Sequence, residues 1–154
     1  CLRGRENNLS NDCIAATSSD GMLRFLKTNG STDHKVLAHD GAAICVKWNL
    51  DGTSLGTSGE DGEVKIWSRS GNLRTKLATY GQPVHSICWG PDNNSMVMTN
   101  GNKLSILRTQ GRGKALQWEV QQRDRGIILD VDWNTISNLI ICGGEDCCYH
   151  IFDS

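Results

Sequence analysis

The sequence predicts an all-β fold, an incomplete β-propeller of about three and a half four-stranded blades. Two observations indicate it. Trp48, Trp89 and Trp133 recur at intervals of roughly 40 residues, which is typical of propeller blades. In addition, the phrase GEDGEVKIWS at 59–68 returns in altered form as GEDCCYHIFDS at 144–154. A period of this length with short strands and tight turns favours blades over any other repeat.

Each tryptophan ends an apolar run, and a turn and two further strand-like runs follow it; a fourth run closes the first two of these units. The clearest unit reads AICVKW, SLGTSG, EVKIWS and RTKLATY, joined by turns rich in Gly, Asn and Asp. No window has the three- and four-residue apolar spacing that an array of helical repeats requires. We therefore expect one domain over 1–154, with blades at about 11–38 (partial), 39–80, 81–121 and 122–154 (partial).

This arrangement predicts an open arc. Seven blades would need roughly 300 residues, and we expect the first unit to begin within its second strand, near Asn11 to Thr17, and the last to stop after its third. An arc leaves unpaired edges, which favour aggregation. The first residue is Cys1 instead of methionine, so we expect a piece of a longer protein.

The composition argues against nucleic acid and membranes as partners. The net charge is −1, from 16 basic and 17 acidic residues, which indicates neither nucleic acid nor a membrane surface. No apolar run approaches the ~20 residues of a membrane span. The seven cysteines are odd in number, and most lie within strand-like runs. They indicate reduced thiols of a cytoplasmic protein that pack as small apolar side chains.

The stretch AHDGAAICVKWNLDGTSLGTSGEDGEVKIWS resembles the WD-repeat family, with Ala38 in place of the usual glycine. In that family a histidine, a serine or threonine, the turn aspartate and the tryptophan form a hydrogen-bonded set. By position these are His39, Thr57, Asp61 and Trp67. A His–Asp–Thr set also fits a catalytic role, but this spacing inside a blade favours a structural one. Other blades depart from it, with Gly81-Gln82 where the histidine is expected, and with Cys142 and Phe152 in the last blade.

Several loop phrases narrow the resemblance. TSSDG, PVHSICWGPD and GIILDVDWN are similar to those of a WD-repeat subunit of intraflagellar transport complex B, from about Cys13 to Ser154. The resemblance implies a non-enzymatic scaffold needed for cilium assembly, found in the cytoplasm and at the basal body and axoneme. It also implies other complex B subunits as partners, and that this chain covers middle blades of the first of two propellers. A scaffold of another cytosolic complex is the alternative.

An enzymatic or metal-binding propeller is a further alternative. The cluster Cys142, Cys147, Cys148 and His150 lacks the spacing of paired zinc ligands, so packing thiols are the better interpretation. A channel site would need convergent polar side chains, and the strands beside the channel offer Lys47, His85, Asp130 and Asp132. We assign no catalytic, cofactor-binding or metal-ligating residue.

Sorting the loops by blade end reveals a charge asymmetry. Loops between third and fourth strands carry the candidate partner-binding residues Arg69, Arg74, Arg108 and Arg112, together with Lys27. The opposite end carries most of the loop acids, among them Asp20, Asp40, Glu60, Asp61, Glu145 and Asp146. These are either solvated loop charges or a basic end that docks an acidic partner segment.

Overall fold

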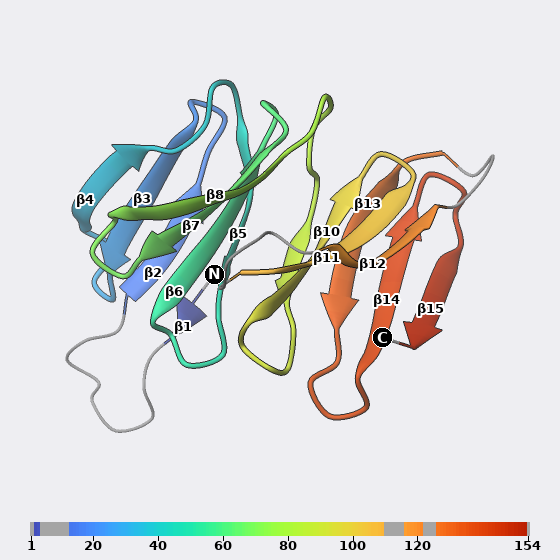
Figure 1. Cartoon of the computed structure of the whole chain (residues 1–154). Coiled ribbons are helices and arrows are strands. Elements are labelled where there is room, and N and C mark those ends of the chain that lie inside the picture. The colour runs from blue at the N-terminus through green and yellow to red at the C-terminus, as the bar shows by residue number, and fades with distance from the viewer. Residues whose placement is uncertain (1, 4–12, 110–115, 122–125, 154) are drawn as a thin grey trace.

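The computed structural model describes residues 2–3, 13–109, 116–121 and 126–153, and these ranges form strands and turns without a helix. Four antiparallel sheets lie side by side (Figure 1). In these ranges no helix has the length and apolar composition to cross a membrane. The strands are β1 (Leu2–Arg3), β2 (Cys13–Thr17), β3 (Met22–Lys27), β4 (Thr32–Leu37), β5 (Ala43–Trp48), β6 (Ser54–Gly59), β7 (Glu63–Ser68), β8 (Leu73–Thr79), β9 (Ile87–Trp89), β10 (Ser95–Asn100), β11 (Lys103–Arg108), β12 (Leu116–Gln121), β13 (Ile128–Trp133), β14 (Leu139–Gly144) and β15 (Tyr149–Asp153).

Strands pair in chain order within each sheet. Sheets β1–β4, β5–β8 and β9–β12 have four strands and sheet β13–β15 has three, and every pairing is antiparallel. The first strands β5, β9 and β13 contact one another in succession. The all-β, incomplete propeller that the sequence predicted is thereby confirmed.

The first sheet begins earlier than the sequence indicated. We expected it to start within its second strand, but Leu2 pairs with Ile14 and Arg3 with Cys13. A two-residue strand is too short to show the alternation of apolar and polar residues that marks a strand in sequence.

The core consists of three clusters, each between neighbouring sheets. Leu23 and Phe25 pack with Trp48, Leu55 and Trp67 between the first and second sheets. A second cluster around Trp89 joins the second sheet to the third, and a third around Trp133 joins the third to the fourth. The recurring tryptophans are therefore interblade contacts, and burial of their apolar area holds the sheets together.

Sheet β13–β15 has one apolar face without a neighbour in the described ranges. Ile140 and Cys142 of β14 point into the core, whereas Ile141 is 45% exposed. On β15, Tyr149 is 73% exposed and Ile151 55%. The alternation places these exposed side chains together on one surface.

A β-bulge recurs in the outermost strand of each four-stranded sheet. In the second sheet Ile66 pairs with Thr75 and Trp67 with Leu73, so Arg74 is the extra residue. Asp33 and Gln117 hold the same place in β4 and β12. A bulge turns its extra side chain away from the regular alternation, which matters for Arg74 below.

Candidate functional site

His39, Thr57, Asp61 and Trp67 form a continuous chain of hydrogen bonds within the second sheet. Asp61 Oδ1 lies 2.9 Å from His39 Nδ1, and His39 Nε2 lies 2.8 Å from Thr57 Oγ1. The Trp67 indole N–H donates to the same Thr57 oxygen at 2.9 Å. The His39 side chain is 0% exposed, so each of its nitrogens needs a partner inside the protein.

Donor and acceptor roles follow from this geometry. Thr57 Oγ1 accepts from Trp67, so its hydroxyl proton is available to His39 Nε2, and His39 Nδ1–H donates to Asp61. His39 is then neutral. Burial lowers the pKa of His39, against the raising effect of Asp61, and this agrees with the neutral form. The hydrogen bonds among these four side chains thus satisfy both ring nitrogens of His39 within the protein.

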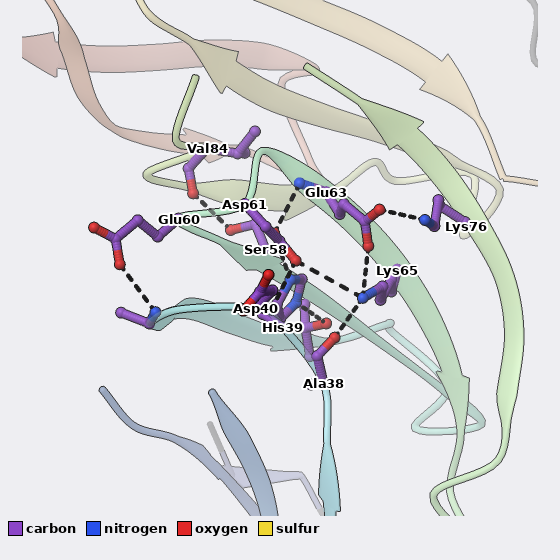
Figure 2. A network of polar contacts seen from close by, with 12 residues as sticks. Ala38, His39, Asp40, Ser58, Glu60, Asp61, Glu63, Lys65, Lys76 and Val84 are labelled. Carbon is purple, nitrogen blue, oxygen red and sulfur yellow. Dashed lines mark hydrogen bonds and ion pairs between the residues drawn. The ribbon is translucent and has the colours of Figure 1, made fainter. Parts of the chain in front are cut away.

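Asp61 also closes the turn between β6 and β7. Its carboxylate accepts from the Glu63 N–H at 3.0 Å and from the Asp40 N–H at 3.1 Å, in addition to His39 (Figure 2). Burial raises the pKa of Asp61, but the hydrogen bonds from Glu63, His39 and Asp40 outweigh it and hold the pKa below its usual value. The charged carboxylate therefore ties three segments of the blade together.

The repeated Gly-Glu-Asp has a common geometry in two sheets. Glu60 Oε2 accepts from the Ala42 N–H at 3.1 Å, and Glu145 Oε2 accepts from the Ile127 N–H at the same distance. At Gly59 an added Cβ would lie 2.5 Å from the His39 ring. Close packing against His39 thus requires glycine at position 59. The glutamate that follows accepts a hydrogen bond from a backbone N–H of the connection that leads into the first strand of the same sheet.

Each turn aspartate also has a basic residue four positions later. Arg24 pairs with Asp20, Lys65 lies 3.9 Å from Asp61, and His150 Nε2 lies 2.9 Å from Asp146. Our sorting of the charges by blade end counted loop residues only and left out these three residues of the strands. The acidic end is consequently less negative than the loops alone indicated.

Lys65 extends the network around the turn (Figure 2). Its ammonium lies 2.6 Å from Glu63 Oε2 and also donates to the Ala38 carbonyl, while Lys76 pairs with the other Glu63 oxygen. Sequence reasoning missed Glu63, Lys65 and Lys76. Only the i, i+4 spacing of Asp61 and Lys65 offered a signal for them.

The third sheet replaces the polar set with apolar contacts. A Cβ added at Gly62 would lie 2.2 Å from the Tyr80 carbonyl oxygen, as one added at Gly21 would lie 2.3 Å from that of His39, so Tyr80 occupies the histidine position. We expected Gly81-Gln82 at the histidine position, and the structure corrects this to Tyr80. The position is set by backbone contacts between the connection and the turn at Gly62, which the sequence does not display. The Tyr80 hydroxyl lies 3.4 Å from the Met98 sulfur.

The last sheet does not assemble a metal centre in the ranges described. Cys142 is buried, Cys147 and Cys148 are exposed, and His150 pairs with Asp146. No group of three or more potential ligands occurs among the described residues. Cys147 occupies the turn position that Gly62 holds in the second sheet, and it adopts a left-handed φ of 59°.

The channel-side residues are engaged with their neighbours. Ser86 donates to Asp130 Oδ1 at 2.6 Å, and the Cys88 thiol lies 3.3 Å from Asp132 Oδ1. Burial raises the pKa of Cys88 to about 11, so this thiol is protonated at neutral pH. Lys47 and His85 are half-buried on the same inner strands or their connections.

Of the four arginines proposed for partner binding, the described part of the chain contains three, since Arg112 lies outside it. Arg69 is half-buried, with its guanidinium 5.9 Å from the centre of the Trp48 ring. Arg74 is exposed and donates to Ser54 Oγ at 2.5 Å. Arg108, at the end of β11, is exposed. All three lie at the end of their sheets opposite the Asp61 turn.

Comparison with known proteins shows which families share this sequence. The family model for the WD domain, G-beta repeat, matches residues 30–68, which contain His39, Thr57, Asp61 and Trp67. The chain is 46% identical over 143 residues to the intraflagellar transport protein 80 homologs of Mus musculus and Rattus norvegicus, covering 93% of this chain. It is 28% identical to the F-box-like/WD repeat-containing protein TBL1X of Mus musculus, covering 97% of this chain and 32% of that protein.

The chain spans 18% of the length of the intraflagellar transport protein 80 homologs that it matches. Sheet architecture, family model and relatives agree, and the chain belongs to the WD-repeat family.

Proposed function

We propose that this chain is part of a non-enzymatic protein-interaction scaffold that works in intraflagellar transport, as a complex B subunit needed for cilium assembly. The observation that carries the proposal is the 46% identity to intraflagellar transport protein 80 homologs across 93% of the chain. Loops vary more than strands do among proteins that share only a fold, so the resemblance of the loop phrases TSSDG, PVHSICWGPD and GIILDVDWN supports a shared role.

The polar chemistry of the molecule supports a scaffold over an enzyme. The histidine and aspartate with the most suggestive geometry, His39 and Asp61, are bonded to Thr57 and to backbone N–H groups. A catalytic pair would need a free atom facing substrate. Metal analysis of the purified protein tests the metal-binding alternative directly.

We further propose that the basic end is the docking face and that its partner carries an acidic segment. Arg69, Arg74 and Arg108 lie at this end, and Arg112 belongs to the same set by sequence. The acids in the neighbouring turns are occupied locally: Asp51 accepts from Thr53, and Asp92 accepts from Asn94 and Ser95. Basic patches of this kind orient a partner and accelerate its encounter.

The experiment is assembly of the complex from ciliated cells. The natural full-length protein carrying Arg69→Glu, Arg74→Glu, Arg108→Glu and Arg112→Glu should recover fewer complex B subunits than wild type. The deficit should shrink as ionic strength rises, because salt screens the interaction.

A matched control makes the same change of charge at the opposite end of the blades. Arg123→Glu with Arg125→Glu, at the opposite end by sequence, is compared with Arg69→Glu with Arg108→Glu. Only the second pair should weaken assembly, with thermal melting used to verify that both fold. Normal assembly of the quadruple variant at low salt refutes the docking face, and recovery of a different complex by the wild type refutes the intraflagellar transport role.

A further inference from the structure

A pocket of about 310 Å³ lies between the second and third sheets, at the basic end. Ile66 of β7 and Trp89 of β9 form its apolar wall. The other lining residues all carry hydrogen-bonding side chains: Ser54, Arg74, Thr75, Asn93 and Thr109. A small cavity with an apolar wall and convergent polar groups is the usual form of a specific recognition site.

Arg74 is the charged group of this pocket, and the β-bulge in β8 places it there. Because Ile66 pairs with Thr75 and Trp67 with Leu73, Arg74 leaves the strand's alternation. Its Nη1 donates to the oxygen of Ser54, a residue only 5% exposed, and this contact fixes the guanidinium. One of five N–H donors is used in that bond.

No carboxylate in the described part of the chain forms an ion pair with Arg74. The corresponding bulge residue of the first sheet is different, because Asp33 is an acid and pairs with Lys27 and His34. The second sheet therefore presents a cation with a fixed orientation, at the mouth of a pocket, without an internal counter-charge among the residues described.

Neighbouring side chains are held in place around it. The Trp89 indole N–H donates to the Lys47 carbonyl at 2.9 Å, and Asn93 Oδ1 accepts from the Leu50 N–H at 2.8 Å. The Asn93 side chain also forms a hydrogen bond with Asp51, so its amide is held from two sides. Positions fixed in this way lower the entropy lost when a ligand binds.

We propose that this pocket binds the carboxylate of a glutamate or aspartate in a protein partner, with Arg74 as its principal donor. The carboxylate accepts from the guanidinium in a planar, charge-assisted pair, and the methylene groups of the acidic side chain pack against Ile66 and Trp89. This inference rests on the proposed docking face and names the residue and the pocket that give it specificity.

The first test uses fluorescein-labelled hexaglutamate as probe and the natural full-length protein, with binding measured by fluorescence anisotropy at low ionic strength. Arg74→Gln should weaken binding about tenfold, as loss of a charge-assisted hydrogen bond predicts. Thr75→Phe, which fills the pocket without changing charge, should weaken binding to a similar extent. Lys35→Gln is the matched control, because it removes an exposed cation of β4 away from the pocket, and it should change binding less than about twofold.

A second measurement needs no variant and so does not depend on folding of a mutant. Phenylglyoxal modifies accessible arginines, and mass spectrometry follows each site in the wild-type protein. Hexaglutamate should slow modification of Arg74 more than that of Arg108, whereas hexaglutamine should protect neither.

The outcomes separate the pocket from the docking face. Equal losses for Arg74→Gln and Lys35→Gln, wild-type binding by a folded Thr75→Phe protein, or equal protection of Arg74 and Arg108 overturns the pocket. The basic end still stands in that case if the quadruple reversal impairs assembly. Normal assembly of the quadruple reversal overturns the docking face itself.

Discussion

Replacing Asp61 by alanine tests whether the polar set holds the second blade together. The substitution removes the acceptor for His39 Nδ1, for the Asp40 N–H and for the Glu63 N–H. His39 is fully buried and cannot turn to water, and an unsatisfied buried donor costs about 1–3 kcal/mol. The two backbone donors lie beside solvent-accessible residues, so water replaces most of their lost bonds.

We therefore expect Asp61→Ala to lower the free energy of unfolding by about 2–3 kcal/mol, most of it from His39. Urea unfolding of the full-length protein, followed by tryptophan fluorescence, measures this. Asp146→Ala is the matched control. Its partner His150 has a 19% exposed side chain, so water can compensate and the loss should be smaller.

Partner binding should fall only as far as folding falls, because the set is bonded within the blade and the Asp61 side chain is only 12% exposed. An Asp61→Ala protein with unchanged stability would refute the structural role. A folded variant that assembles poorly at temperatures well below its melting point would also contradict it, since this would give the set a direct part in binding.

Three further predictions concern the left-handed turns, pH and the open face. Cys147→Gly should raise the unfolding free energy by about 1 kcal/mol, because glycine adopts the φ of 59° without strain; Gly62→Ala should lower it, since its Cβ would lie 2.2 Å from the Tyr80 carbonyl oxygen. Burial lowers the pKa of His39, so below about pH 6.5 the unfolded state binds more protons than the folded state does. The free energy of unfolding measured with urea should therefore decline as the pH falls below that value, and a His39→Gln protein should show a smaller decline. The isolated 154-residue chain should be oligomeric or poorly soluble through its exposed face, and Ile151→Lys should shift light scattering towards monomer; a monomeric, sharply melting wild-type species would contradict this.

Much of the architecture could be predicted because it depends on local rules. Alternation of apolar and polar residues marks the strands, glycine and aspartate mark the turns, and the recurrence of Trp48, Trp89 and Trp133 marks the blades. The positions of His39 and Asp61 came from the resemblance to the WD-repeat family, carried over by position. These signals lie within short segments, so they can be read without knowledge of how the chain folds.

The rest depends on pairing between strands, which a single sequence does not display. A bulge shifts the register by one residue, and only the paired strands reveal that Arg74 lies at one of the two shifts in β8. Tyr80 takes the histidine position because its backbone packs against Gly62 as that of His39 packs against Gly21, and Glu60 closes a connection 18 residues earlier in the chain. The sequence by itself determined the blade and its turns, and its resemblance to the WD-repeat family indicated the candidate polar set. The tertiary structure alone decided which side chains share an interblade groove, because the walls of that groove come from different sheets.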